Sequence, residues 1–162
     1  MSLSDQQQLY QQIILDHGKA RHGATSAPLP PLDDLVIEST EGRVAESHQI
    51  NPTCGDETTV RVTIGEADAI DDVVWWGDGC TISMAAASVL SDTVRGTSVV
   101  DARALVGEYR AMLQSRGTAE PDEQRLGDAA AFVGVSRYPA RVKCAMLAWV
   151  AFEQALLTAE PR

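Results

Sequence analysis

The stretch Asn51-Pro52-Thr53-Cys54-Gly55-Asp56 places a cysteine and an aspartate two residues apart, with a glycine between them. Taken alone, such a stretch is typical of a turn, because Asp and Gly favour loops. Gly55 also lets the backbone bend so that both side chains can meet one ion. The chain has two other cysteines, Cys80 and Cys144. Three thiols and one carboxylate form a ligand set that suits tetrahedral zinc, and our interpretation starts from this set.

The two remaining cysteines each have a particular setting. Cys80 follows two glycines and precedes an Ala-rich stretch that we expect to be helical. A helix N-terminus lowers the pKa of a thiol and so favours the metal-binding thiolate. Cys144 lies in an amphipathic helix. For both Cys80 and Cys144, the competing interpretation is a small apolar residue that is simply buried. Arg141 and Lys143 make the surroundings of Cys144 electropositive. We favour one shared site, because soft thiolates select zinc or iron.

Length and composition favour a single domain over residues 1–162, since a chain of this size buries roughly 70% of its unfolded surface. The net charge of −10 repels phosphate groups, which argues against nucleic acid and anionic membranes as partners. The N-terminus lacks the layout of a secretory signal. The longest apolar run has nine residues, too few to span a membrane. Three widely spaced cysteines indicate a reducing compartment, so we expect a cytoplasmic protein.

Local patterns predict an α+β fold, with a small antiparallel sheet of about three strands and helices packed on one of its faces. The clearest strand is 58–64, where polar and apolar residues alternate, and 70–76 forms a further strand. An additional hairpin is possible, with strands at 34–40 and 43–49 around Glu41-Gly42. Before the sheet, Ser4 begins a capping box for a helix over 5–17 that Gly18 ends, and 19–31 is a loop. Helices are expected after it at 82–94, from Ser98 or Asp101 to about 115, at 121–132, and from about 136 through Leu156, with Pro139 in the first turn.

The three histidines are weaker candidates for the site. His17 and His22 stand next to glycines, and we expect them to be surface or loop residues and not ligands. His48 lies on a predicted strand near Cys54 and can approach the site, although a lone strand histidine is more often half-buried polar surface. Trp75 and Trp76 stand where the sheet reaches the site, and we expect them to pack in the core and its rim.

Four segments together resemble the IscU/NifU-like family of iron–sulfur cluster assembly proteins. They are Leu9 to His17, Asn51 to Asp56, Gly79 to Ser83 and Arg141 to Cys144, and the match covers about 8–157. The three cysteine motifs occur in the family order, which is more specific than any one of them. The resemblance implies the IscU/SufE-like version of the α+β fold.

Two departures resemble the SufU branch of this family. Scaffold-type IscU proteins have a histidine directly before the third cysteine, where this chain has Lys143, and they carry a Leu-Pro-Pro-Val-Lys segment that is absent here. The region between Cys80 and Cys144 also holds a helical insertion. The resemblance implies a zinc-dependent sulfurtransferase that accepts persulfide sulfur from a PLP-dependent cysteine desulfurase of the SufS type. The sulfur then passes to a SufB-containing scaffold complex for cluster assembly.

By motif, the resemblance implies that Cys54, Asp56, Cys80 and Cys144 bind zinc and that Cys54 accepts the sulfur. It further implies that a desulfurase histidine displaces Cys54 from the metal, which frees a thiolate in the complex. Arg141 is placed to orient an anionic thiolate or persulfide, with a solvent-facing role as the alternative. Four protein ligands leave no open position for water, which argues against a hydrolytic zinc enzyme.

Two other functions stay open at this point. The same ligands suit an iron–sulfur scaffold that binds iron as a [2Fe–2S] cluster, although Lys143 is a poor ligand at neutral pH. A structural zinc adaptor is the third interpretation, and the size of the chain argues against a need for metal in folding. We expect a monomer or a weak homodimer.

Overall fold

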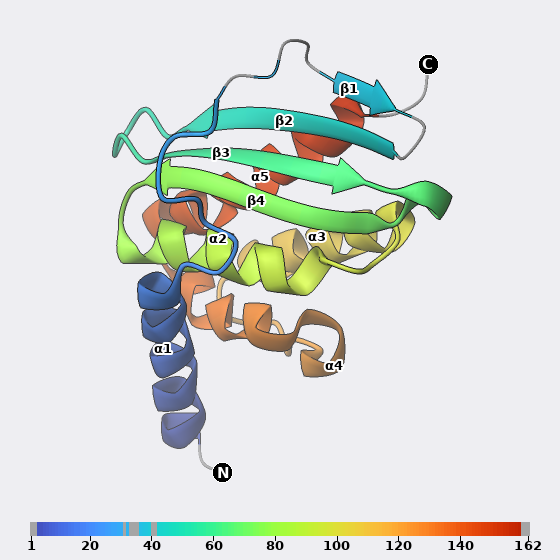
Figure 1. The fold of residues 1–162 in the computed structure, drawn as a ribbon. Helices are drawn as coiled ribbons and strands as arrows, with labels where there is room; N and C mark the ends of the chain where they lie inside the picture. Colours follow the sequence, from blue (N-terminus) through green and yellow to red (C-terminus); the bar gives the residue numbers. More distant parts are fainter. Residues whose placement is uncertain (1–2, 31, 33–35, 40–41, 160–162) are drawn as a thin grey trace.

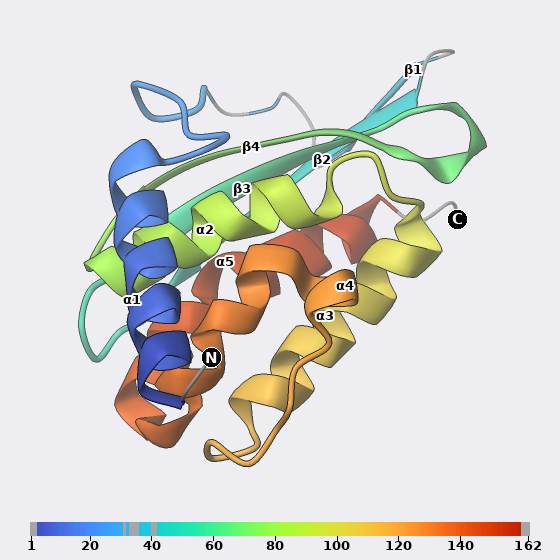
Figure 2. The ribbon, with the colours of Figure 1, turned by 90° about the horizontal axis from the view of Figure 1, so that it is seen from below.

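The computed structural model describes residues 3–30, 32, 36–39 and 42–159. Its four strands form one antiparallel sheet in chain order: β1 (Val36–Ser39), β2 (Gly42–Ile50), β3 (Glu57–Ile64) and β4 (Ile70–Asp78). Helices lie against one face of this sheet (Figures 1 and 2). The predicted α+β fold is confirmed, and β1 pairs with β2 as the extra hairpin. Predicted hairpin positions 34, 35, 40 and 41 lie outside the described residues.

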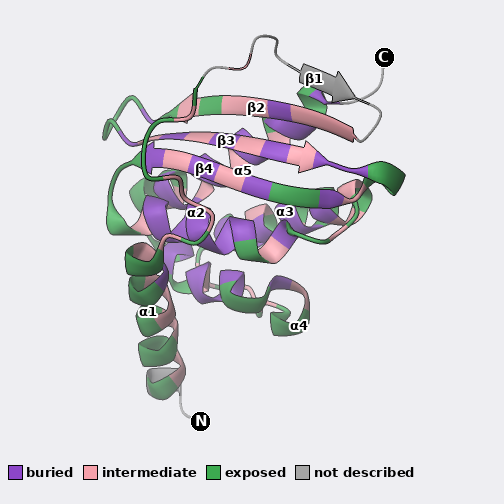
Figure 3. Ribbon diagram, in the orientation of Figure 1, coloured by how far each residue is buried: buried purple, intermediate pink, exposed green. Residues whose placement is uncertain are grey.

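β3 is the central example of how the sequence builds the sheet. Its buried and half-exposed residues alternate along all eight positions. Thr58, Val60, Val62 and Ile64 point toward the helices and are at most 1% exposed. The residues between them, on the opposite face, are polar and of intermediate burial. Figure 3 shows buried and intermediate positions alternating along β3. Since side chains in a strand alternate between the two faces, the Thr/Val pattern predicts this arrangement, and the predicted strands 58–64 and 70–76 are confirmed.

Two helices form the layer next to the sheet, α2 (Thr81–Val94) and α5 (Pro139–Thr158). The first contacts β4, whereas α5 lies along β2 and β3. Alanines 85–87 of α2 are fully buried, and small side chains let the two helices approach closely. Trp149 of α5 donates its indole N–H to the carbonyl of Ala86 at 3.1 Å. Pro139 occupies the first turn of α5, as predicted.

The N-terminal helix differs from the prediction at both ends. α1 (Leu3–Ala20) begins before Ser4, so Ser4 is not its N-cap, and it continues past Gly18. Arg21 then adopts a φ of +50° and ends it. A Cβ on Gly18 would lie 2.8 Å from Cγ2 of Thr81, so this glycine is where α1 packs closely on α2. The prediction that Gly18 ends the helix was wrong because the glycine serves a contact between helices.

The remaining elements are a connection within the sheet and an outer layer of helices. A short 3-10 helix, η1 (Glu66–Asp68), joins β3 to β4. The Ser98 hydroxyl caps α3 (Val99–Leu113), so Ser98 is the correct one of the two predicted starts, Ser98 and Asp101. The predicted helix 121–132 is only partly correct, because α4 (Glu123–Leu126) stops after four residues. Gly127, with φ of +54°, breaks it, and the chain continues as the 3-10 segment η2 (Gly127–Arg137).

The segment after α1 lies along the edge of β4. Thr25 donates its backbone N–H to the Trp75 carbonyl at 2.8 Å, and Trp75 donates to the Gly23 carbonyl at 3.0 Å. The predicted loop over 19–31 is therefore tied to the sheet, although α1 takes its first two positions and residue 31 lies outside the described part. Within the described residues, each helix is too short or too polar to cross a membrane.

Candidate metal centre

The Cys54 loop connects β2 to β3 and is held by Asn51. The backbone N–H of Asn51 donates to the Asp56 carbonyl at 2.8 Å, and Gly55 donates to the Asn51 carbonyl at 2.7 Å. Thr53 donates its N–H to Oδ1 of Asn51 at 3.1 Å, which forms an Asx turn. Gly55 has a φ of +79°, a conformation that favours glycine. The loop therefore presents Cys54 to solvent on an ordered turn.

The four predicted ligands come from four separate places in the fold. Cys54 is on the loop, Asp56 directly precedes β3, Cys80 is the N-cap of α2, and Cys144 lies in the second turn of α5. One ligand atom each from Cys54, Asp56 and Cys144 lie within 4.8 Å of one another. Asp56 and Cys144 are buried, whereas the thiols of Cys54 and Cys80 are exposed. The tertiary structure thus brings together side chains that are up to 90 positions apart in the sequence.

Ser83, a residue that the sequence analysis did not assign, links Cys80 to this group. Its hydroxyl donates to Oδ2 of Asp56 at 3.0 Å. Its backbone N–H donates to the Cys80 sulfur at 3.5 Å, in the usual geometry of a helix N-cap. The sequence signal that could have identified Ser83 was its position three residues after Cys80, the N-cap of α2. Ser83 therefore orients both a carboxylate and a thiol of the candidate centre.

The backbone at Gly79 leaves just enough room for this arrangement. A Cβ at this position would lie 2.5 Å from the Ser83 hydroxyl and 2.8 Å from Cγ of Asp56. A side chain here would push both groups aside. The thiols of Cys54 and Cys144 converge with the Asp56 carboxylate, and Ser83 links Cys80 to this group. Such a donor set fits zinc or iron better than magnesium or calcium.

The two buried residues among the proposed ligands, Asp56 and Cys144, have pKa values that are shifted in opposite directions. Burial raises the pKa of the Asp56 carboxyl, but hydrogen bonds from Ser83, Cys80 and Cys144 outweigh it, and the net pKa is lowered. Burial, together with Cys80 and Cys54 nearby, raises the pKa of the Cys144 thiol to about 12. That thiol points to the Ala140 carbonyl, 3.8 Å from its sulfur. At neutral pH without metal, Asp56 is therefore ionised and Cys144 is a neutral thiol.

This difference predicts how metal binding depends on pH. As a proposed thiolate ligand, Cys144 would lose its proton on binding metal, whereas Asp56 has none to lose near neutrality. The Cys144 proton alone makes zinc affinity rise about tenfold per pH unit near neutrality. Competition with a chelator at several pH values measures this slope. An affinity that does not change with pH would rule out Cys144 as a ligand.

Other predicted residues lie around the centre or away from it. Arg141 and Lys143 are both exposed in the first turns of α5. His48 bonds Thr59 at 2.8 Å and pairs with Glu57 at 3.4 Å on the polar face of the sheet, so it is turned away from the cysteines. Half-buried polar surface was the better interpretation of it.

The expected surface or loop position was wrong for His17 and was correct for His22. His17 is 5% exposed, because α2 and η2 cover it, while His22 lies in the exposed loop after α1. Trp75 is fully buried and Trp76 is partly buried, as expected of core and rim.

The family model of the NifU-like N-terminal domain matches residues 31–145. This match spans the Cys54 loop, Asp56, Cys80 and Cys144, the residues that the fold brings to one place. The chain belongs to this NifU-like family. Between Cys80 and Cys144 the chain forms α3, α4 and η2, which pack mainly on helices rather than on the sheet.

Two relatives of this NifU-like chain span nearly its whole length. The iron–sulfur cluster assembly scaffold protein IscU of Streptococcus pyogenes serotype M1 is 36% identical over 157 residues, covering 96% of this chain and 87% of the relative. The zinc-dependent sulfurtransferase SufU of Bacillus subtilis is 33% identical over 154 residues, covering 94% and 92%.

A solved structure supports the fold. The crystal structure of a candidate iron–sulfur cluster assembly scaffold protein for the SUF system from Fervidobacterium islandicum superposes with a TM-score of 0.68. It is 29% identical, and the match covers 90% of this chain and 94% of that one.

Proposed function

We propose that this NifU-like protein is a zinc-dependent sulfurtransferase of iron–sulfur cluster assembly. It accepts sulfur from a cysteine desulfurase of the SufS type and passes it to a SufB-containing scaffold complex. The observation that carries the proposal is the convergence of Cys54, Asp56 and Cys144 beside Cys80, with Cys54 exposed on its loop. The identity of 33% to a relative named as a zinc-dependent sulfurtransferase supports it.

Cys54, Asp56, Cys80 and Cys144 would hold the zinc. The bound ion keeps the ligand thiols deprotonated at neutral pH. Asp56 is ionised before the metal arrives, and Ser83 holds it in place. The Cys80 sulfur accepts the Ser83 backbone N–H at the start of α2, which orients it. Cys144 is buried on α5, so it stays on the rigid part of the centre.

Cys54 is the group that this arrangement makes available for sulfur transfer. Its thiolate attacks the terminal sulfur of the donor persulfide, so a new S–S bond forms on Cys54 while the donor S–S bond breaks. The donor cysteine leaves as a thiolate and takes up a proton. Cys54 fits the role because it lies on an exposed loop, whereas Cys80 and Cys144 belong to helices packed on the sheet.

Arg141 is the residue we propose to orient the anionic sulfur. It lies in the first turn of α5, three residues before Cys144, and its side chain is exposed. Positions three apart on a helix share one face, so Arg141 lies over the side of α5 that carries Cys144. A guanidinium there adds positive charge for a thiolate or persulfide.

The second candidate is an iron–sulfur scaffold, and the 36% identity to a relative named as a scaffold favours it. The two functions differ in what the centre holds. Protein purified without added iron is expected to contain one zinc per chain and to gain one sulfur on Cys54 in mass spectra after reaction with a desulfurase and cysteine. An iron–sulfur absorption spectrum with little zinc, and no added sulfur, would establish the scaffold instead.

A further inference from the structure

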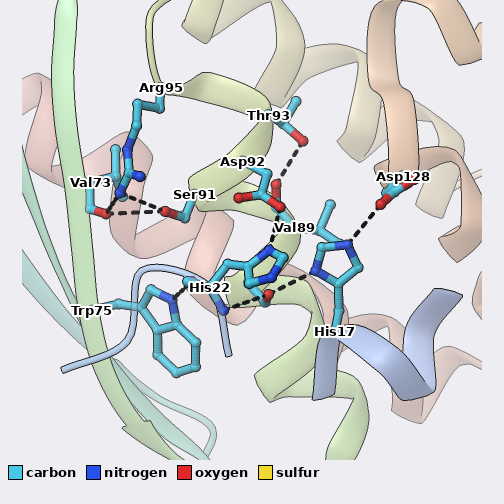
Figure 4. Close-up of polar contacts among 11 residues, drawn as sticks. His17, His22, Val73, Trp75, Val89, Ser91, Asp92, Thr93, Arg95 and Asp128 are labelled. Carbon is cyan, nitrogen blue, oxygen red and sulfur yellow. Dashed lines mark hydrogen bonds and ion pairs between the residues drawn. The ribbon is translucent and has the colours of Figure 1, made fainter. Parts of the chain in front are cut away.

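A second group of metal-ligand side chains lies outside the cysteine centre. His17 near the end of α1, His22 in the following loop and Asp92 of α2 each offer one ligand atom within 4.8 Å of the others (Figure 4). The two imidazole rings meet edge to face, with centroids 5.1 Å apart. The group lies about 12 Å along α2 from Cys80, since Ser88 beside it is eight residues further on. It is therefore separate from the cysteine centre.

His17 is held in an orientation suited to a ligand. Its Nε2 lies 2.8 Å from a carboxylate oxygen of Asp128 in η2, and its Nδ1 lies 2.8 Å from the Ser88 hydroxyl. The Asp128 carboxylate can only accept, so Nε2 carries the ring proton of the neutral imidazole. The Ser88 hydroxyl, whose oxygen also accepts the backbone N–H of His22 at 2.9 Å, then donates to Nδ1. The network thus assigns the ring proton to Nε2, facing Asp128, and the lone pair to Nδ1. A carboxylate on the far nitrogen is the usual support of a metal-bound histidine.

His22 and Asp92 are the two exposed members of the group. Nδ1 of His22 and Oδ2 of Asp92 are 2.6 Å apart, and a single proton joins them. Their side chains are 51% and 45% exposed, so both can turn toward an ion. Ligand atoms about 2.1 Å from a tetrahedral metal lie about 3.4 Å apart, so small movements convert the present spacing into a coordination shell. The backbone of His22 stays fixed, because its carbonyl accepts the Trp75 indole N–H at 2.8 Å.

We propose that His17, His22 and Asp92 form a second metal site, distinct from the cysteine centre, for a divalent first-row transition ion. Two imidazoles and one carboxylate suit zinc, iron(II), cobalt or nickel, whereas magnesium and calcium prefer all-oxygen shells. The ion replaces the proton between His22 and Asp92. Asp128 is a positioning residue, because it acts through His17. The chain's net charge of −10 favours the approach of a cation.

Binding here has a structural consequence. His17 belongs to α1, Asp92 belongs to α2, and Asp128 reaches the site from η2. An ion held by the three ligands joins the end of α1 to α2. The site therefore couples metal binding to the docking of the N-terminal helix, independently of sulfur transfer at Cys54.

Cobalt titration of the full chain, with zinc already loaded, tests the proposal. The wild type is expected to take up one further Co²⁺ per chain, with weak d–d absorption and no sulfur-to-cobalt charge-transfer band. His22→Gln and Asp92→Asn should each weaken this binding by about 100-fold, because each removes a ligand at an exposed position. Asp128→Asn should weaken it by about tenfold. His48→Gln is the matched control, since it removes an exposed histidine elsewhere, and it should bind as the wild type does.

The outcomes separate this site from the cysteine centre. A thiolate band during the titration would mean that some cobalt binds the cysteines. Only the cobalt uptake that His22→Gln removes would then count as evidence for the second site. The proposal is overturned if the wild type takes up no further cobalt. It is equally overturned if His22→Gln and Asp92→Asn bind cobalt as tightly as His48→Gln does.

Discussion

Replacing Cys54 with alanine is expected to abolish sulfur acceptance and leave an appreciable share of the zinc in place. The loss should be complete, because no other group in the proposed reaction forms the new S–S bond. Zinc should remain because Asp56, Cys80 and Cys144 still provide three ligands, which suffice in many catalytic zinc sites. The measurements are desulfurase turnover, the mass of the protein after reaction, and the zinc content of the variant.

Cys144→Ala provides the comparison for this experiment. It removes a proposed ligand that α5 holds in a buried position, so both zinc and activity should be lost. We expect the same of Cys80→Ala. The proposed role of Cys54 would be wrong if the added sulfur were found on Cys80 or Cys144. It would also be wrong if Cys54→Ala still stimulated the desulfurase, and the loop would then be a passive ligand.

Replacing Asp56 with alanine is expected to weaken zinc binding by more than about 100-fold and to abolish stimulation of the desulfurase. Asp56 is the proposed ligand that is already ionised without metal, and Ser83 holds it at the centre. The fold should persist, because the large buried side chains, among them Trp75, Trp149 and Phe152, pack without any metal. Chelator competition measures the affinity, and circular dichroism measures the fold.

Asp78→Ala is the matched control for this variant. Asp78 of β4 lies opposite Glu57 of β3 in the strand register, and it is exposed. It is close in sequence to Cys80. This control removes the same charge without removing a proposed ligand, so its zinc affinity should stay within about twofold of the wild type. Global unfolding of Asp56→Ala, with Asp78→Ala intact, would mean that the metal is structural.

The regular elements were predictable because their signals are local. The Thr/Val alternation of 58–64 predicts β3 from nearest neighbours alone, and Pro139 marks the start of α5 because its ring suits a first helical turn. The α4 region was harder. Gly127 with a positive φ divides it, and η2 follows as a 3-10 segment whose alanines are buried against other helices. Packing of that kind overrides local helix propensity.

The candidate centre was likewise predictable only in part from the sequence. Residue types and motif order were enough to select Cys54, Asp56, Cys80 and Cys144, because three thiols and one carboxylate suit zinc and the three cysteine motifs occur in the family order. Asn51 and Ser83 were not assigned, although both support the centre. Their hydrogen bonds depend on where the loop and α2 lie relative to one another, and single residues carry no sign of that distance.

By itself, the sequence determined the α+β class, most of the strand and helix positions, the family and the four proposed ligands, since each follows from periodicity or from a motif a few residues long. The tertiary structure decided that Gly18 is a helix contact and not a helix end, that His17 is buried, and that His17, His22 and Asp92 meet. These features join residues more than 60 positions apart. These contacts form only when α1 packs against α2, so local sequence patterns do not predict them.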